Sequence, residues 1–189
     1  QGAMSDGDWL VIDGGNTHFW SEIAVNIAGF QGKKLGGILH PGTFSLLGVG
    51  VSFAVSAKNV DPNRNVVLIS GDGAFLSGGL SIEAAFQENR PIVVVIDNNG
   101  GLDCISQQQE RLFASGTHYT TDFRDIPFHT MFEGLGGHGE LVTRREDIIP
   151  AVQRAMASGK TACVNVKVKG VISPIVLATT SKRDKASIE

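Results

Sequence analysis

The chain has 189 residues, of which 42% are hydrophobic, and its formal net charge at pH 7 is −3. This length suits one domain with a sizeable core and is too short for two comfortable ones. No long basic run occurs, which argues against a nucleic-acid partner, and no apolar stretch is long enough to cross a membrane. The two cysteines, Cys104 and Cys163, show neither metal-ligand spacing nor a disulfide framework, so a reducing compartment is expected.

The ends of the chain differ in character from its middle. No signal peptide is visible, and residues 1–3 before Met4 look like a cloning scar. We therefore expect a cytoplasmic protein whose folded domain covers residues 4–170. Residues 171–189 form a tail that is first apolar and then cationic. It is interpreted either as a frayed, solvated end or as a lid that orders over a substrate mouth, with its cations near a phosphate group.

The first expected strand covers residues 9–12, and the glycine-containing loop 13–17 follows it. A helix should begin near Asn16 or Thr17, because either side chain can cap a helix N-terminus. A loop that leads into a helix N-terminus is also a candidate anion site. The capping role and an anion-binding role of Asn16 both remain open at this point.

A second stretch, residues 40–57, opens with a Pro-Gly pair and continues as a helix of small residues. Small residues let a helix pack closely against a sheet or a cofactor, but they do not identify a ligand. His40, at the start of this stretch, is interpreted first as an exposed loop residue and second as a substrate contact.

Two apolar runs rich in β-branched residues, 66–69 and 92–96, are predicted to be buried strands of a parallel sheet. Residues 79–89 between them show a helical pattern. Loop 70–75 follows the first strand, and loop 97–102 follows the second. The two loops should therefore lie at the carboxyl edge of the sheet, where ligands bind in open α/β folds.

These two loops contain the residue types that a magnesium diphosphate needs. Asp72 offers a carboxylate, Asn99 an amide oxygen, and the backbone near Gly101 a carbonyl, and Mg²⁺ prefers oxygen ligands supplemented by phosphate. The backbone amides of Gly73 and Ala74 can face a diphosphate. A lone G-D-G would favour an interpretation as ordinary turn residues, but a G-D-G followed after 24 residues by N-N is much more specific.

The remaining elements complete an alternating pattern. In chain order we expect a loop and short helix over 101–105, a surface loop over 111–125, a helix over 125–135 and a brief strand at 141–142. A capping box at 143–146 should open the next helix, which Pro150 either kinks or starts. The last strand is expected over 161–168. Alternating strands and helices predict an α/β fold with a parallel sheet of about six strands and helices on both faces.

The G-D-G and N-N pair resembles the signature of thiamine-diphosphate (ThDP) enzymes, where it marks the diphosphate-binding, or PP, domain. This resemblance covers residues 9–168. It implies that ThDP and Mg²⁺ are the cofactors and that the metal ligands are Asp72, Asn99 and the carbonyl oxygen of Gly101. Asn98 is expected to be structural.

Two further segments resemble particular branches of this family. Residues 41–50 are similar to the A-G-T-F-G-T-M-G-V-G segment of 2-hydroxyacyl-CoA lyases and oxalyl-CoA decarboxylases. By that resemblance Leu47 is the apolar wedge under the bent cofactor, and Ser45 gives a carbonyl to its aminopyrimidine. Residues 15–20 are similar to the G-Q-H-Q-x-W loop of acetolactate synthases. The residues implied to contact the cofactor are Asn16, Thr17, Ser45, Leu47, Gly71, Gly73, Ala74, Asn99, Gly101 and Leu102.

Family members also need a glutamate that lies on a separate pyrimidine-binding, or Pyr, domain, and nothing in the chain resembles that domain. The resemblance therefore implies a PP-domain subunit of a split carbon–carbon lyase that acts on a 2-hydroxyacyl-CoA, with a Pyr-domain partner in a heterotetramer. The alternative is a 2-oxoacid decarboxylase or an acetolactate-synthase-like carboligase. A third, remote interpretation is a non-catalytic nucleotide-binding module.

Overall fold

The computed structural model describes residues 2–28, 32, 34–113 and 115–181. Six strands form a single sheet in the order β2-β1-β3-β4-β6-β5, and every neighbouring pair is parallel. The strands are β1 (Trp9–Asp13), β2 (Gly37–Leu39), β3 (Val66–Gly71), β4 (Val93–Asn98), β5 (His138–Val142) and β6 (Ala162–Lys167). The sequence prediction of an α/β fold with about six parallel strands is confirmed.

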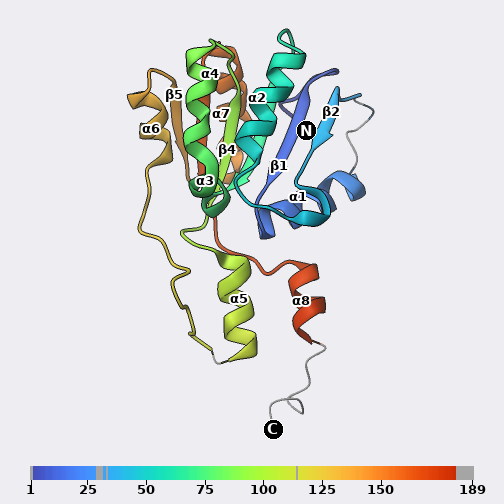
Figure 1. Cartoon of the computed structure of the whole chain (residues 1–189), viewed down its shortest axis with the longest axis vertical. Helices are drawn as coiled ribbons and strands as arrows, with labels where there is room; N and C mark the ends of the chain where they lie inside the picture. The colour runs from blue at the N-terminus through green and yellow to red at the C-terminus, as the bar shows by residue number, and fades with distance from the viewer. Residues whose placement is uncertain (1, 29–31, 33, 114, 182–189) are drawn as a thin grey trace.

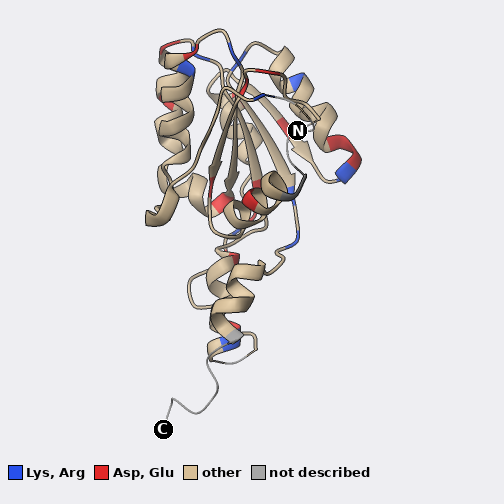
Figure 2. Cartoon of the chain, turned by 90° about the vertical axis from the view of Figure 1, so that its right-hand side faces the viewer, with Lys and Arg blue, Asp and Glu red and all other residues tan. Residues whose placement is uncertain are grey.

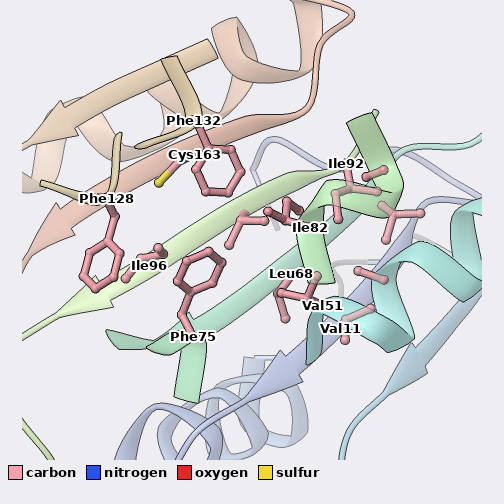
Figure 3. Close-up of a cluster of buried hydrophobic side chains, with 14 of the residues drawn as sticks. Val11, Val51, Leu68, Phe75, Ile82, Ile92, Ile96, Phe128, Phe132 and Cys163 are labelled. Atoms are coloured by element: carbon pink, nitrogen blue, oxygen red, sulfur yellow. The ribbon is translucent and has the colours of Figure 1, made fainter. Parts of the chain in front are cut away.

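One face of the sheet is covered by α2 (Gly50–Val60), α3 (Asp72–Gly78), α4 (Glu83–Gln87) and α6 (Phe128–Gly134). Phe75 of α3 packs edge-on against Phe128, with ring centroids 5.6 Å apart, and also contacts Phe132. Beneath these rings lie the fully buried strand residues Leu68 and Ile96, as Figure 3 shows. This face therefore holds the aromatic half of the core.

The other face is covered by α1 (Asn16–Ala28) and α7 (Ile148–Ala157). Its core is aliphatic and includes Leu10, Ile12 and Val67, which alternate along the strands with residues of the first face. Since side chains of a strand point to opposite faces in turn, strands buried on both sides are apolar at almost every position. This explains the unbroken apolar runs in the sequence.

Two helices extend beyond the carboxyl edge of the sheet instead of covering a face. They are α5 (Asp103–Leu112), which follows β4, and α8 (Pro174–Ser181), which follows β6. Figures 1 and 2 show both below the sheet, side by side. Arg111 of α5 donates a hydrogen bond of 2.6 Å to the Thr180 hydroxyl of α8. The tail is thus helical over residues 174–181, while the expectation for residues 182–189 lies outside the described part.

Several expected element boundaries were wrong. The helix expected over 79–89 begins at Asp72, because α3, a 3-10 turn (η2, Gly79–Ile82) and α4 follow one another directly. The surface loop expected from residue 111 begins later, since α5 continues to Leu112. The short edge strand β2 was not expected at all. Short or irregular elements depend on tertiary contacts more than on local pattern, which accounts for these misses.

The expected capping box at residues 143–146 does not form. A 3-10 turn (η3, Arg145–Asp147) precedes α7, and no side-chain hydrogen bond caps either element. Pro150 is the third residue of α7. In the first turn of a helix a backbone N–H has no intrahelical acceptor, so proline is tolerated there. Of the two expectations for Pro150, a mark of the helix start is the correct one.

No helix among the described residues is long and apolar enough to cross a membrane. Lys and Arg residues are scattered along the ribbon in Figure 2 rather than gathered into one stripe.

We predict that Phe132→Ala lowers the free energy of unfolding by about 3–5 kcal/mol, because the ring is buried and its loss leaves a cavity against Phe75 and Phe86. Urea unfolding followed by circular dichroism measures the change. Leu135→Ala is the control, since Leu135 is 50% exposed. Equal unfolding midpoints for Phe132→Ala and the unmodified chain would contradict this description of the core.

Candidate functional site

A cavity of about 250 Å³ opens at the carboxyl edge of the sheet. It is lined by every residue that the sequence implied for the cofactor or the metal: Asn16, Thr17, Ser45, Leu47, Gly71, Asp72, Gly73, Ala74, Asn99, Gly101 and Leu102. These residues come from four separate segments of the chain. The structure therefore brings the expected site residues together.

The topology explains why the cavity lies here. β2 lies next to β1 on one side, and β3, which follows β2 in the chain, lies next to β1 on the opposite side. Such a reversal of strand order leaves a crevice outside the carboxyl ends of the two central strands. The register places Asp13 beside Ser70 and Gly71 beside Asp97, so the ends of β1, β3 and β4 lie in one row.

The Asp72 carboxylate is the best-connected group of the cavity. One oxygen, Oδ1, accepts a 2.7 Å hydrogen bond from the Gly73 N–H, and the other, Oδ2, accepts bonds of 2.8 and 3.1 Å from Gly100 and Gly101. The residue is only 2% exposed. Asp72 thus joins the end of β3 to the loop that follows β4.

Burial raises the pKa of the Asp72 carboxyl group, although the three backbone N–H donors act in the opposite direction. Burial likewise raises the pKa of Asp97, and it raises that of Asp103, with the charges of Asp72 and Asp97 adding to the effect. Desolvated carboxylates that repel one another favour a cation or a proton between them. The acidic side of this cavity therefore suits a positively charged ligand.

The loop after β4 is held in place by backbone pairing. Leu102 donates its N–H to the Thr121 carbonyl at 2.8 Å, and Phe123 donates to the Gly100 carbonyl at 2.7 Å. Asn99 lies at the bend, where its side-chain oxygen accepts the Gly101 N–H at 3.1 Å. The segment 111–125, which was expected to be a surface loop near the mouth of the site, contributes a strand-like stretch that supports the site.

Asn98 has no place in the cavity, as expected for a structural residue. Its side-chain amide donates to the Asn165 side-chain oxygen at 2.9 Å and to the Ile126 carbonyl at 3.2 Å. These bonds attach the end of β4 to β6 and to the start of α6.

Asp13, at the end of β1, positions the segment that carries Ser45 and Leu47. Its Oδ2 atom accepts hydrogen bonds from the Gly48 and Gly50 amides at 3.0 and 2.7 Å. Ser45 has a left-handed backbone with φ 48°. This is a conformation that glycine adopts easily and other residues adopt rarely, and the similar family segment has glycine at this position.

The start of α1 completes the cavity. Thr17 donates its hydroxyl to Asp97 at 2.7 Å, and Asn16 donates its amide to Gln107 of α5 at 2.8 Å. The helix begins at Asn16, so neither side chain occupies the position before the helix that was expected for a cap. The side-chain oxygen of Asn16 is buried and has no hydrogen-bond partner. A buried orphan acceptor beside a cavity marks a position for a ligand or a water molecule.

Sequence reasoning did not assign Asp13 or Asp97 to this site. The signal for both was their position, because each is an aspartate at or next to the end of an apolar strand run. Cys104, in the expected loop and short helix 101–105, lines the cavity, and Gln107 reaches the site only through its hydrogen bond to Asn16.

The residues present fit a magnesium diphosphate. Asp72 and Asn99 supply oxygen atoms of the kind Mg²⁺ prefers. A Cβ atom at Gly73 would lie 2.4 Å from the Leu102 side chain, and one at Gly14 would lie 3.1 Å from the Gly71 nitrogen, so these glycines let the segments around the cavity pack more closely than side chains would allow. Phosphate groups bind where glycines expose backbone amides in this way.

Comparisons with known proteins agree with this geometry. The family model described as "Thiamine pyrophosphate enzyme, C-terminal TPP binding domain" matches residues 13–166. The chain is 39% identical over 129 residues to the acetolactate synthase large subunit IlvG of Mycobacterium tuberculosis, a match that covers 68% of this chain and 23% of that protein. It is 28% identical over 183 residues to 2-hydroxyacyl-CoA lyase 2 of Mus musculus, covering 96% of this chain and 27% of that protein.

A solved structure is similar as well: the thiamine diphosphate-dependent 4-hydroxybenzoylformate decarboxylase of Rhodococcus jostii RHA1, with a TM-score of 0.69 and 26% identity. That match covers 90% of this chain and 31% of the decarboxylase chain. The chain thus spans about a quarter of the length of the curated relatives. The family-model match includes more than half of the residues, and the described cavity lies inside it. The chain therefore belongs to the thiamine pyrophosphate enzyme family and carries that family's C-terminal cofactor-binding domain.

Proposed function

We propose that the chain is the diphosphate-binding half of a ThDP- and Mg²⁺-dependent enzyme that cleaves or forms a carbon–carbon bond. The single observation that supports it best is the convergence of four segments on the cavity, which Asp72, Gly73 and Asn99 line together. Bound ThDP supplies a carbanion equivalent that attacks carbonyl carbons.

In this proposal each group of the chain has a defined task. Asp72, Asn99 and the Gly101 carbonyl hold Mg²⁺. The Ala74 amide donates to the diphosphate, and the Gly73 amide, which donates to Asp72 Oδ1, would be shared between that oxygen and the diphosphate. Leu47, which lines the cavity, would pack against the cofactor as an apolar wedge. Ser45 offers its carbonyl to the aminopyrimidine, and the left-handed backbone of Ser45 positions that group.

The preferred substrate class is a 2-hydroxyacyl-CoA, cleaved to formyl-CoA and an aldehyde or ketone, or formed in the reverse reaction. Supporting this are the relatives named 2-hydroxyacyl-CoA lyase, one of which matches over 96% of the chain. The second candidate is a carboligase of 2-oxo acids, supported by the higher identity, 39%, to an acetolactate synthase. Parallel assays with a 2-hydroxyacyl-CoA and with pyruvate distinguish the two.

A partner with a Pyr domain is part of the proposal. The acidic residues that line the cavity in the described chain are Asp72 and Asp103, and no glutamate lies among them. Phe44 and Leu46, in the segment that leads to Leu47, are 93% and 62% exposed. Exposed apolar side chains next to a site mark a contact surface. Phe75 does not extend this surface, since it is 3% exposed and belongs to the core.

We predict that Asp72→Ala or Asn99→Ala abolishes Mg²⁺-dependent ThDP binding in the assembled enzyme. Removing one of few protein ligands leaves the diphosphate charge uncompensated, which costs roughly 3–5 kcal/mol. Calorimetric titration with ThDP at fixed Mg²⁺ measures the loss. Asn59→Ala is the matched control, because Asn59 bonds to Glu88 on the surface, outside the cavity. Unchanged ThDP affinity in both variants would refute the metal assignment.

Leu47→Ala tests the wedge. We expect turnover to fall much more than ThDP affinity, because a truncated side chain lets the bound cofactor relax from its bent form. Leu47→Met serves as the control, since methionine has a similar volume and such swaps are tolerated. Steady-state kinetics and ThDP titrations on the same preparations provide both values. Normal turnover in Leu47→Ala would show that another residue fills this role.

The partner prediction concerns activity and association together. The chain with ThDP and Mg²⁺ should show no lyase or carboligase turnover, and a Pyr-domain protein should restore it. Phe44→Asp should weaken that association by placing a charge in an apolar contact, as sedimentation velocity can measure. Val60→Asp is the control, because Val60 is 78% exposed at the far end of α2. Substantial turnover by the chain alone would contradict the need for a partner.

A further inference from the structure

A cluster of two histidines and a glutamate lies outside the cavity, between α1 and the end of β2. His18 Nε2 is 2.9 Å from Glu22 Oε1, and His40 Nδ1 is 3.5 Å from the same oxygen. One ligand atom from each of the three side chains lies within 4.8 Å of the others. None of the three residues lines the cavity at the sheet edge.

The fold explains this juxtaposition. His18 and Glu22 are four residues apart on α1, so they share one side of the helix. β2 pairs with β1 and ends at Leu39, which places His40 at the same edge of the sheet where α1 begins. The imidazole rings of His18 and His40 have centroids 5.3 Å apart. His18 is buried, while the side chains of Glu22 and His40 are 36% and 39% exposed and accessible to an ion from solvent.

The donor set has a defined metal preference. Two imidazole nitrogens and one carboxylate oxygen are ligands of zinc and related transition-metal ions, and three protein ligands leave a position for water. Magnesium prefers oxygen ligands throughout. Donors around a tetrahedral zinc ion are separated by roughly 3.3 Å, given metal–ligand bonds of about 2.0–2.1 Å. The separations of 2.9 and 3.5 Å lie on either side of that value.

The existing hydrogen bonds show what an ion would replace. The contact between His18 and Glu22 uses one proton shared between a ring nitrogen and a carboxylate. A divalent cation can take the place of that proton. His40 Nδ1 now accepts the Gly42 N–H at 3.2 Å. A metal bound through this nitrogen would break the hydrogen bond from the Gly42 N–H, so metal binding should change the environment of that one backbone amide.

We propose that His18, Glu22 and His40 form a binding site for a divalent transition-metal ion of the zinc class, separate from the cavity. The ion would connect α1 to the segment that begins at His40 and carries Ser45 and Leu47. The proposal depends only on these three side chains, and it stands whether or not the chain acts on a 2-hydroxyacyl-CoA or a 2-oxo acid.

Other histidines of the described chain provide a contrast. His118 contacts Glu110 through Nε2 and Asp122 through Nδ1, so its two acidic partners lie on opposite sides of the ring and cannot share one ion with it. His138 contacts a single carboxylate, that of Glu140, which also binds Arg154. His138 is therefore the matched control for a histidine–glutamate contact without a third ligand.

The test is a titration of the purified chain with Zn²⁺ in competition with a chromophoric chelator, and with Co²⁺ monitored by visible absorption. We expect one equivalent of bound Zn²⁺ and a tetrahedral Co²⁺ spectrum. His40→Ala and Glu22→Gln should each weaken Zn²⁺ binding at least tenfold, and His138→Ala should leave it unchanged. Circular dichroism in the absence of metal verifies that each variant is folded. Because His40 and Glu22 are partly exposed, their variants decide the matter even if His18→Ala fails to fold.

A second readout locates the ion. On addition of Zn²⁺ the amide resonance of Gly42 should shift more than that of Gly139, which lies next to His138. Cys104→Ser should retain the site, because thiolate is not among the proposed ligands. The proposal is overturned if the unmodified chain binds no Zn²⁺ at micromolar concentration, if His40→Ala and Glu22→Gln bind it normally, or if His138→Ala or Cys104→Ser weakens binding as much as they do.

Discussion

The buried carboxylate of Asp72 is the interaction on which the rest of the site depends. Three backbone N–H groups, from Gly73, Gly100 and Gly101, donate to it. A desolvated charge is costly unless it is hydrogen-bonded or paired, so these donors stabilise it and thereby fix the turn after β3 against the turn after β4. Burial nevertheless leaves the pKa of the group raised, and a cation in the cavity would supply the compensation that the amides provide only in part.

Hydrogen-bonded carboxylates also occur at the neighbouring strand ends. Asp13 of β1 accepts the Gly48 and Gly50 amides, and Asp97 of β4 accepts the Thr17 hydroxyl. Carboxylates at the carboxyl ends of three adjacent strands therefore hold loops that come from distant parts of the chain. These bonds lie within the chain itself and hold the cavity walls, and pre-organisation of this kind lowers the cost of binding.

The segment between β2 and α2 connects the cavity with the proposed zinc-class site. It begins at His40, next to Glu22, and continues to Ser45 and Leu47 at the cavity wall. Asp13 holds its far end through the Gly48 and Gly50 amides. Its middle is anchored less, since Phe44 and Leu46 expose most of their apolar surface. A metal ion at His40 and a partner domain at Phe44 and Leu46 would both act on this stretch.

What could be predicted from the sequence was local and periodic. Apolar runs with β-branched residues indicated the central strands. The aspartate, glycine and asparagine residues after those runs indicated where a metal ion and a diphosphate would bind, because parallel strands bring their carboxyl ends to one edge of the sheet. Only the tertiary structure decided the rest. Three contacts join residues that are far apart in the chain: Thr17 with Asp97, Asn16 with Gln107, and His18 with His40. The short strand β2 exists because it pairs with β1. Such contacts follow from packing, which leaves no periodic trace in the sequence.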